Sequence, residues 1–99
     1  MDPLGRMLNT RKTYRCMTVL LKELAGEICH GRLLMVHEGG YSTVYVPFCG
    51  LAVMEALSGI KTEVKDPHLE SYENLPGQEL QPHQDAVIKK VEERAAKVK

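Results

Sequence analysis

One short apolar run, residues 33–36 with the sequence LLMV, most constrains what this chain can fold into. The run begins just after a helix stop at Gly31 and ends before Gly39 and Gly40. A continuous apolar run between such signals is typical of a strand buried on both faces. A parallel strand cannot satisfy its backbone groups without neighbouring strands, and the sequence offers no second convincing one. We therefore expect part of a larger fold, or one side of an obligate complex.

An amphipathic helix is predicted before this strand. Apolar residues recur at helical spacing from Thr10 to about His30, with Asn9 or Thr10 as the N-cap and Gly31 as the stop. A helix followed directly by a buried strand is half of an α/β unit. The predicted fold class is therefore α/β.

Two more helices are predicted after the glycine pair. Pro47 can open a helix that is apolar on nearly every face and ends at Ser58 and Gly59, so it expects cover on all sides. A last helix over residues 84–98 carries its apolar residues on one stripe and is expected to dock by that face. The stretch 61–81 between them contains turn residues and mixed charge, and is predicted to be a connecting loop.

Composition excludes several classes of function. Thirteen basic residues balance thirteen acidic ones in the 99-residue chain, so no overall field exists to hold nucleic acid or an anionic membrane. No apolar run approaches the roughly 20 residues that a membrane span needs. The odd number of cysteines, Cys16, Cys29 and Cys49, argues against a disulfide framework. We expect an intracellular protein, cytoplasmic or nuclear, with no direct nucleic-acid or membrane partner.

Four segments carry a resemblance to a known family. Residues 31–42, with the sequence GRLLMVHEGGYS, strongly resemble the last core strand and the glycine-tyrosine loop of class II histone deacetylases and their bacterial amidohydrolase relatives. Residues 45–53 (YVPFCGLAV) resemble the next helix of the same subgroup. Residues 2–7 are similar to the stretch after the family's final zinc-binding aspartate, and residues 78–84 resemble its C-terminal tail.

The resemblance implies a zinc hydrolase with an arginase-like, parallel-sheet α/β fold. Aspartate and histidine ligands hold the metal in that family and a histidine pair transfers protons, but none of these motifs occurs in this sequence. We expect residues 1–60 to be the C-terminal part of a histone deacetylase domain, 61–81 a connecting loop and 82–99 a C-terminal helix. No zinc is expected on this chain alone. The absence of the ligand motifs would be explained if an N-terminal portion is missing. An internal start at Met1, a truncated gene or a wrong gene model could each produce such a chain.

Tyr41 is the catalytic candidate that the resemblance implies. In such a mechanism the hydrolysis of an acetyl-lysine amide develops an oxyanion, to which a protonated phenol can donate a hydrogen bond. The resemblance also implies that Gly39 and Gly40 belong to a substrate-binding loop, in which glycine permits the backbone angles that turn Tyr41 inward. Glu38 belongs to the loop and is not assigned as a base.

Other reactive side chains have structural interpretations. A strand followed by two glycines is, by itself, usually a turn. His37 at a strand end is more often hydrogen-bonded structure than a ligand, and His30 suits a helix terminus. Cys49 has no basic neighbour to form a thiolate, and Ser42 has no identifiable base, so we expect packing and turn-shaping roles.

Three functions compete. The first is a fragment of a zinc-dependent histone deacetylase-like hydrolase of acetylated lysine or related acetylated amines, inactive alone, so whether the chain is itself an enzyme stays open. The second is a non-catalytic interaction module or homo-oligomeric remnant, which predicts a defined oligomer without zinc. The third is an anion-binding loop at Gly39 and Gly40, which ranks far lower because no phosphate-binding glycine motif follows.

Overall fold

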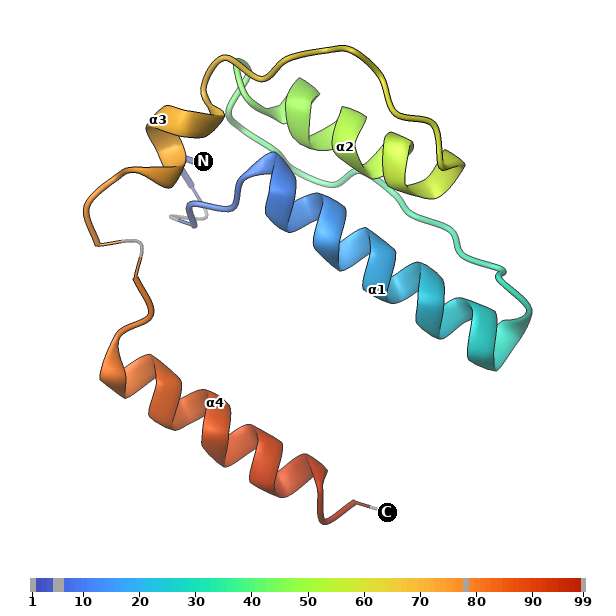
Figure 1. Ribbon diagram of the computed structural model, residues 1–99, viewed down its shortest axis with the longest axis vertical. Helices are drawn as coiled ribbons and strands as arrows, with labels where there is room; N and C mark the ends of the chain where they lie inside the picture. The colour runs from blue at the N-terminus through green and yellow to red at the C-terminus, as the bar shows by residue number, and fades with distance from the viewer. Residues whose placement is uncertain (1, 5–6, 78, 99) are drawn as a thin grey trace.

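The computed structural model describes residues 2–4, 7–77 and 79–98, in which four α-helices occur. They are α1 (Arg11–Cys29), α2 (Val46–Ser58), α3 (Leu69–Glu73) and α4 (Pro82–Ala95). Figure 1 shows α1 and α2 side by side and running in the same direction, while α4 lies apart from them. Within the described part of the chain, no helix is long and apolar enough to cross a membrane.

The α1–α2 contact is built from small residues. Thr18 and Ala25 of α1 are buried, as are Ala52 and Ala56 of α2. Side chains of this size let two helix backbones approach closely. Lys22 adds a polar tie, because its ammonium group donates to the carbonyls of the last turn of α2, at 2.9 Å and 3.0 Å.

The predicted apolar stripe of α1 lies on a different face from this contact. Its large side chains remain exposed, with Leu20 at 64% and Ile28 at 72% of full accessibility. The helix itself ends near the predicted stop, where His30 and Gly31 both adopt left-handed backbone angles. The Gly31 N–H donates to the carbonyl of Ala25 at 2.8 Å, which closes the helix in a Schellman-type turn.

The predicted strand over residues 33–36 does not form. Residues 32–42 have no regular secondary structure, and none of the described residues lies in a strand, so the α/β class is not confirmed. The physical reason is that a strand is defined by pairing, and residues 2–4, 7–77 and 79–98 contain no second strand with which it could pair. The segment instead returns along α1 to the start of α2 (Figure 1).

The stretch predicted as a connecting loop contains α3 and is bound to the helix pair. Arg11 donates to the carbonyl of Val64 at 3.1 Å, and Lys12 pairs with Glu73 at 2.7 Å. Helix α3 is short and is surrounded by turn residues, so the sequence did not predict it. These contacts hold the segment against the N-terminal end of α1.

Helix α4 (Pro82–Ala95) overlaps the helix predicted over residues 84–98, beginning two residues earlier and ending three residues earlier, and it has a well-formed start. Gln81 and Gln84 form a reciprocal capping box, and Pro82 occupies the first turn. No residue of α4 is buried, and Val87 and Val91 on its apolar stripe are largely exposed. The docking expected from that stripe is therefore not seen. Residues 1, 5, 6, 78 and 99, which fall in three of the predicted segments, lie outside the described residues.

Candidate functional site

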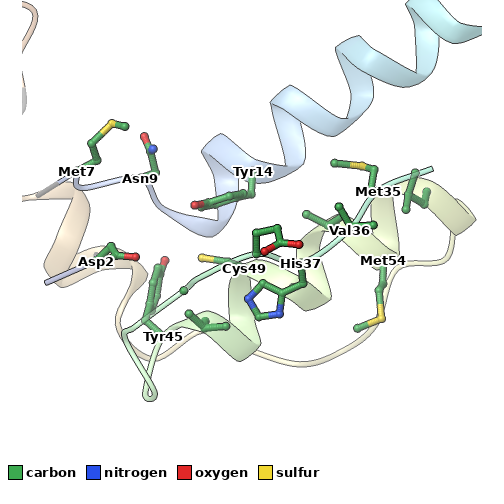
Figure 2. Close-up of a pocket in the computed structure, with 16 residues that line it drawn as sticks. Asp2, Met7, Asn9, Tyr14, Met35, Val36, His37, Tyr45, Cys49 and Met54 are labelled. Atoms are coloured by element: carbon green, nitrogen blue, oxygen red, sulfur yellow. The ribbon is translucent and has the colours of Figure 1, made fainter. Parts of the chain in front are cut away.

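A cavity of about 550 Å³ lies between α1, the segment after it and α2. Figure 2 shows the segment that carries Met35, Val36 and His37 running past Tyr14 of α1 and Cys49 of α2, which line the same cavity. Most of the wall is apolar, and Asp2, Asn9, His37 and Glu38 add polar groups to it. An apolar cavity with a few polar groups can bind a ligand or side chain that is mostly apolar and has a polar end.

The predicted loop residues lie at this cavity but are not all part of its wall. Gly40 lines the cavity, whereas Gly39 and Tyr41 do not. Tyr41 is 58% exposed, its ring lies over Gly39, and its backbone N–H points to Asp2 Oδ2 at 3.4 Å. The structure thus places the candidate catalytic side chain next to the cavity and open to solvent.

The glycine pair is required by backbone geometry. Gly39 and Gly40 have φ angles of +62° and +84°, which side-chain-bearing residues rarely adopt. A Cβ atom on Gly40 would lie 2.7 Å from His37 Nε2 and 3.0 Å from Val46 Cγ2. Gly40 therefore allows the loop, His37 and the start of α2 to approach one another.

Tyr45 anchors this loop to the rest of the molecule. Its side chain is 1% exposed, and its hydroxyl donates to Asp66 Oδ2 at 2.9 Å while accepting from the Arg11 backbone N–H at 3.1 Å. The Arg11 N–H is one of the donors that the start of a helix leaves without an intrahelical partner. Thr10 stands at the N-cap but makes no side-chain cap bond, so the Tyr45 hydroxyl supplies the cap. Burial raises the pKa of the Tyr45 phenol above its ordinary value.

An aromatic cluster surrounds the Tyr45 ring. Tyr72 packs edge-on against it with ring centroids 4.8 Å apart, and His68 stacks on Tyr72 at 5.8 Å. Phe48 of α2 completes the group, with its centroid 6.1 Å from that of Tyr45. Through this cluster, residues 68–72 fix the end of the loop that carries Tyr41.

Glu55 is a buried carboxylate in an otherwise uncharged helix. It is 3% exposed and receives hydrogen bonds from Arg11 Nη2 at 3.3 Å and from the Thr62 N–H at 2.8 Å. The Arg15 guanidinium and the Thr62 hydroxyl bind it as well. A buried charge is tolerated only when it is paired and fully hydrogen-bonded, as here. Glu55 is therefore a structural ion, tying α1 and the segment after α2 to α2.

The surroundings of the remaining candidate residues indicate structural roles. Among residues 2–4, 7–77 and 79–98, no group of three or more histidine, cysteine, aspartate or glutamate side chains could hold a metal. Burial raises the pKa of the Cys49 thiol, in line with a packing role rather than a reactive thiolate. His30 lies at the C-cap of α1, as its structural interpretation predicted.

Sequence reasoning missed the two residues that organise the site. Glu55 could have been noticed, since it is the one charged residue in the apolar helix VPFCGLAVMEALS. Tyr45 gave no comparable signal, because its partners Arg11 and Asp66 are 34 and 21 residues away in the chain.

Known proteins resemble this chain over about two thirds of its length. A histone deacetylase-like amidohydrolase of Pseudomonas aeruginosa is 53% identical over 66 residues, and histone deacetylase 8 of Arabidopsis thaliana is 40% identical over 68. These matches cover 67% and 69% of this chain but 17% of each relative. No family-level sequence profile matches the chain. At these identities, the chain corresponds to a fragment of a protein of the histone deacetylase family.

Proposed function

We propose that this chain supplies the Tyr41 loop of a zinc-dependent hydrolase that acts on acetylated lysine or a related acetylated amine, in the arginase-like α/β fold of that family. The observation that carries the proposal is the loop geometry. Two successive glycines with left-handed angles precede an exposed tyrosine, and the second of them, Gly40, lines a cavity. The similarity to one protein named as a histone deacetylase-like amidohydrolase and one named as a histone deacetylase supports the reaction class.

Tyr41 acts through its hydroxyl. Hydrolysis of an amide passes through a tetrahedral intermediate whose former carbonyl oxygen carries negative charge. A phenol donates one hydrogen bond, and no described residue of this chain already occupies the Tyr41 hydroxyl. Tyr45 and the aromatic cluster hold the chain four residues further on, which limits the positions that Tyr41 can reach.

The metal of such an enzyme does not fit the residues described here, because they offer no ligand cluster. The proposal therefore assigns no zinc ligand and no proton-transfer histidine to this chain. The 99 residues alone are expected to be inactive, and an intracellular location is part of the same proposal. The alternative, an interaction module without catalysis, predicts that Tyr41 can be changed without any effect on hydrolysis.

The test is a graft. This chain's matched residues replace the corresponding 66-residue segment of the Pseudomonas relative, and hydrolysis of an acetyl-lysine peptide is measured. In the active graft, Tyr41→Phe should lower kcat about 100- to 1000-fold with KM little changed, as for the loss of one oxyanion donor. Ser42→Ala, on the same loop, is the matched control. Equal kcat values for Tyr41→Phe and Ser42→Ala would remove Tyr41 from the mechanism.

A further inference from the structure

Tyr41 lies at the junction between an open segment and a closed turn. Residues 33–40 before it form no backbone hydrogen bond with another described residue. After it, the N–H groups of Tyr45 and Val46 both donate to the carbonyl of Ser42, at 3.0 Å and 2.9 Å, which closes a turn. The segment before Tyr41 also contains the two glycines, which have the widest choice of backbone angles. The position of Tyr41 therefore depends on contacts that its own backbone makes.

Asp2 supplies such a contact. Its Oδ2 atom accepts a hydrogen bond from the Tyr41 backbone N–H at 3.4 Å. Its second oxygen, Oδ1, accepts from the Leu4 N–H at 2.8 Å, and the Asp2 N–H donates to the Met7 carbonyl at 3.3 Å. These two bonds fix the orientation of the carboxylate that faces the loop. A carboxylate makes stronger hydrogen bonds to N–H groups than a neutral acceptor does.

Two hydrogen bonds tie the N-terminal segment to the loop, each between a side chain and a backbone N–H. The Asp2 carboxylate accepts from the Tyr41 N–H. The Tyr45 hydroxyl accepts from the Arg11 N–H at 3.1 Å. Asp2 also lines the cavity, together with Gly40 (Figure 2). Tyr45 follows the turn, so its bonds leave the backbone at Tyr41 free to pivot about the glycine pair, and the bond from Asp2 limits that freedom.

We infer that Asp2 is a positioning residue, which holds the backbone of Tyr41 so that the Tyr41 hydroxyl faces the oxyanion of the proposed hydrolysis. Asp2 acts through the Tyr41 N–H and has no contact with the substrate in this role. The inference rests on the proposed function, because it assigns Asp2 no purpose without the hydroxyl of Tyr41. A displacement of a reacting group by about 1 Å can lower a rate about 100-fold. The Asp2 bond is exposed, so we expect a smaller loss of about tenfold when it is removed.

The test is a double-mutant cycle in a graft of the Pseudomonas relative that carries residues 2–73 of this chain, with an acetyl-lysine peptide as substrate. Asp2→Ala should lower kcat about tenfold and change KM by less than about twofold, because only the placement of Tyr41 changes. In the Tyr41→Phe background, Asp2→Ala should have almost no further effect, because the hydroxyl that Asp2 positions is absent. Glu63→Ala, which removes an exposed carboxylate elsewhere, is the control and should leave kcat unchanged.

The cycle separates this inference from the proposed function. An equal loss of kcat from Asp2→Ala in both backgrounds would overturn the positioning role and leave the role of Tyr41 intact. If Tyr41→Phe does not lower kcat, the proposed function fails and the positioning role fails with it. A loss from Asp2→Ala that appears in KM rather than kcat would also overturn the inference.

A second measurement does not depend on activity. In the 99-residue chain, hydrogen exchange of the Tyr41 amide, followed by NMR, should be about three- to tenfold faster in Asp2→Ala, as for the loss of one hydrogen bond. Exchange of the Tyr45 amide, which donates to Ser42, is the internal control and should not change. Unchanged exchange at Tyr41, or equally faster exchange at both amides, would overturn the inference.

Discussion

Replacing Tyr45 with phenylalanine tests whether one hydroxyl anchors the Tyr41 loop. The change keeps the ring in its aromatic cluster but removes the bond to Asp66 at 2.9 Å and the bond from the Arg11 N–H at 3.1 Å. A hydrogen bond to a charged group contributes about 1.5 to 3 kcal/mol and a neutral one about 1 kcal/mol. Asp66 is only half-buried and water can replace part of its bond, so we expect a loss of about 2 kcal/mol.

Urea denaturation followed by circular dichroism measures this loss. With a slope of about 1 to 2 kcal/mol per molar urea, the midpoint should fall by about 1 to 2 M. Tyr72→Phe is the matched control, because no described residue bonds to the Tyr72 hydroxyl while its ring packs in the same cluster. Equal midpoints for the two variants would refute the anchoring role of the Tyr45 hydroxyl.

The same residue predicts a dependence on alkaline pH. The folded-state pKa of Tyr45 is raised above its unfolded value of about 10. The stabilisation from the protonated phenol is therefore complete below about pH 10 and is lost as the pH rises beyond it. The free-energy difference between the unaltered chain and Tyr45→Phe should shrink between about pH 10 and 12. A difference that stays constant over this range would contradict the assignment.

Three further predictions concern the remaining contacts. Glu55→Ala should cost about 3 kcal/mol in urea denaturation, because it leaves guanidinium groups without their buried carboxylate, and a loss below about 1 kcal/mol would show that the ion pair is not structural. Gly40→Ala should destabilise the chain by at least about 1 to 2 kcal/mol through its left-handed angle, whereas Gly26→Ala, with open space around it in α1, should stabilise it by about 0.5 to 1 kcal/mol. Exposed Cys16 should react with a disulfide reagent well before Cys49, whose raised pKa delays its thiolate to higher pH, and equal rates would contradict the burial of Cys49.

Local signals predicted three of the four described helices, whereas the short helix α3 lies in a stretch predicted to be a connecting loop. Neighbouring residues predicted an N-cap at Asn9 or Thr10, of which the structure has Thr10, as well as the stop near Gly31 and Pro47 in the first turn of α2. Each depends on interactions within a few positions, such as backbone angles and i to i+4 contacts, which a sequence displays directly. Gly39 and Gly40 adopt left-handed angles, which glycine permits because it has no side chain.

Features that depend on distant partners were not predictable. Glu55 is stable inside an apolar helix only because Arg11, Arg15 and Thr62 all bind its carboxylate. No local sequence pattern predicts that these three residues meet there. The strand over residues 33–36 fails for the converse reason: its local pattern is strand-like, but the pairing partner is absent from the described chain. The catalytic assignment of Tyr41 stays a prediction, which the graft can test.

The contacts around Arg11 have a consequence for synthesis on the ribosome. This residue begins the first helix, yet the groups that hold it and its neighbour Lys12 lie 34 to 61 positions later in the chain. At about 5 to 20 residues per second, the ribosome needs about 3 to 12 s to produce the last of them. A single helix is marginal in water, so α1 lacks the support of these contacts for that interval. The nascent chain therefore offers molecular chaperones a window of seconds in which to bind α1 before Tyr45 can cap it.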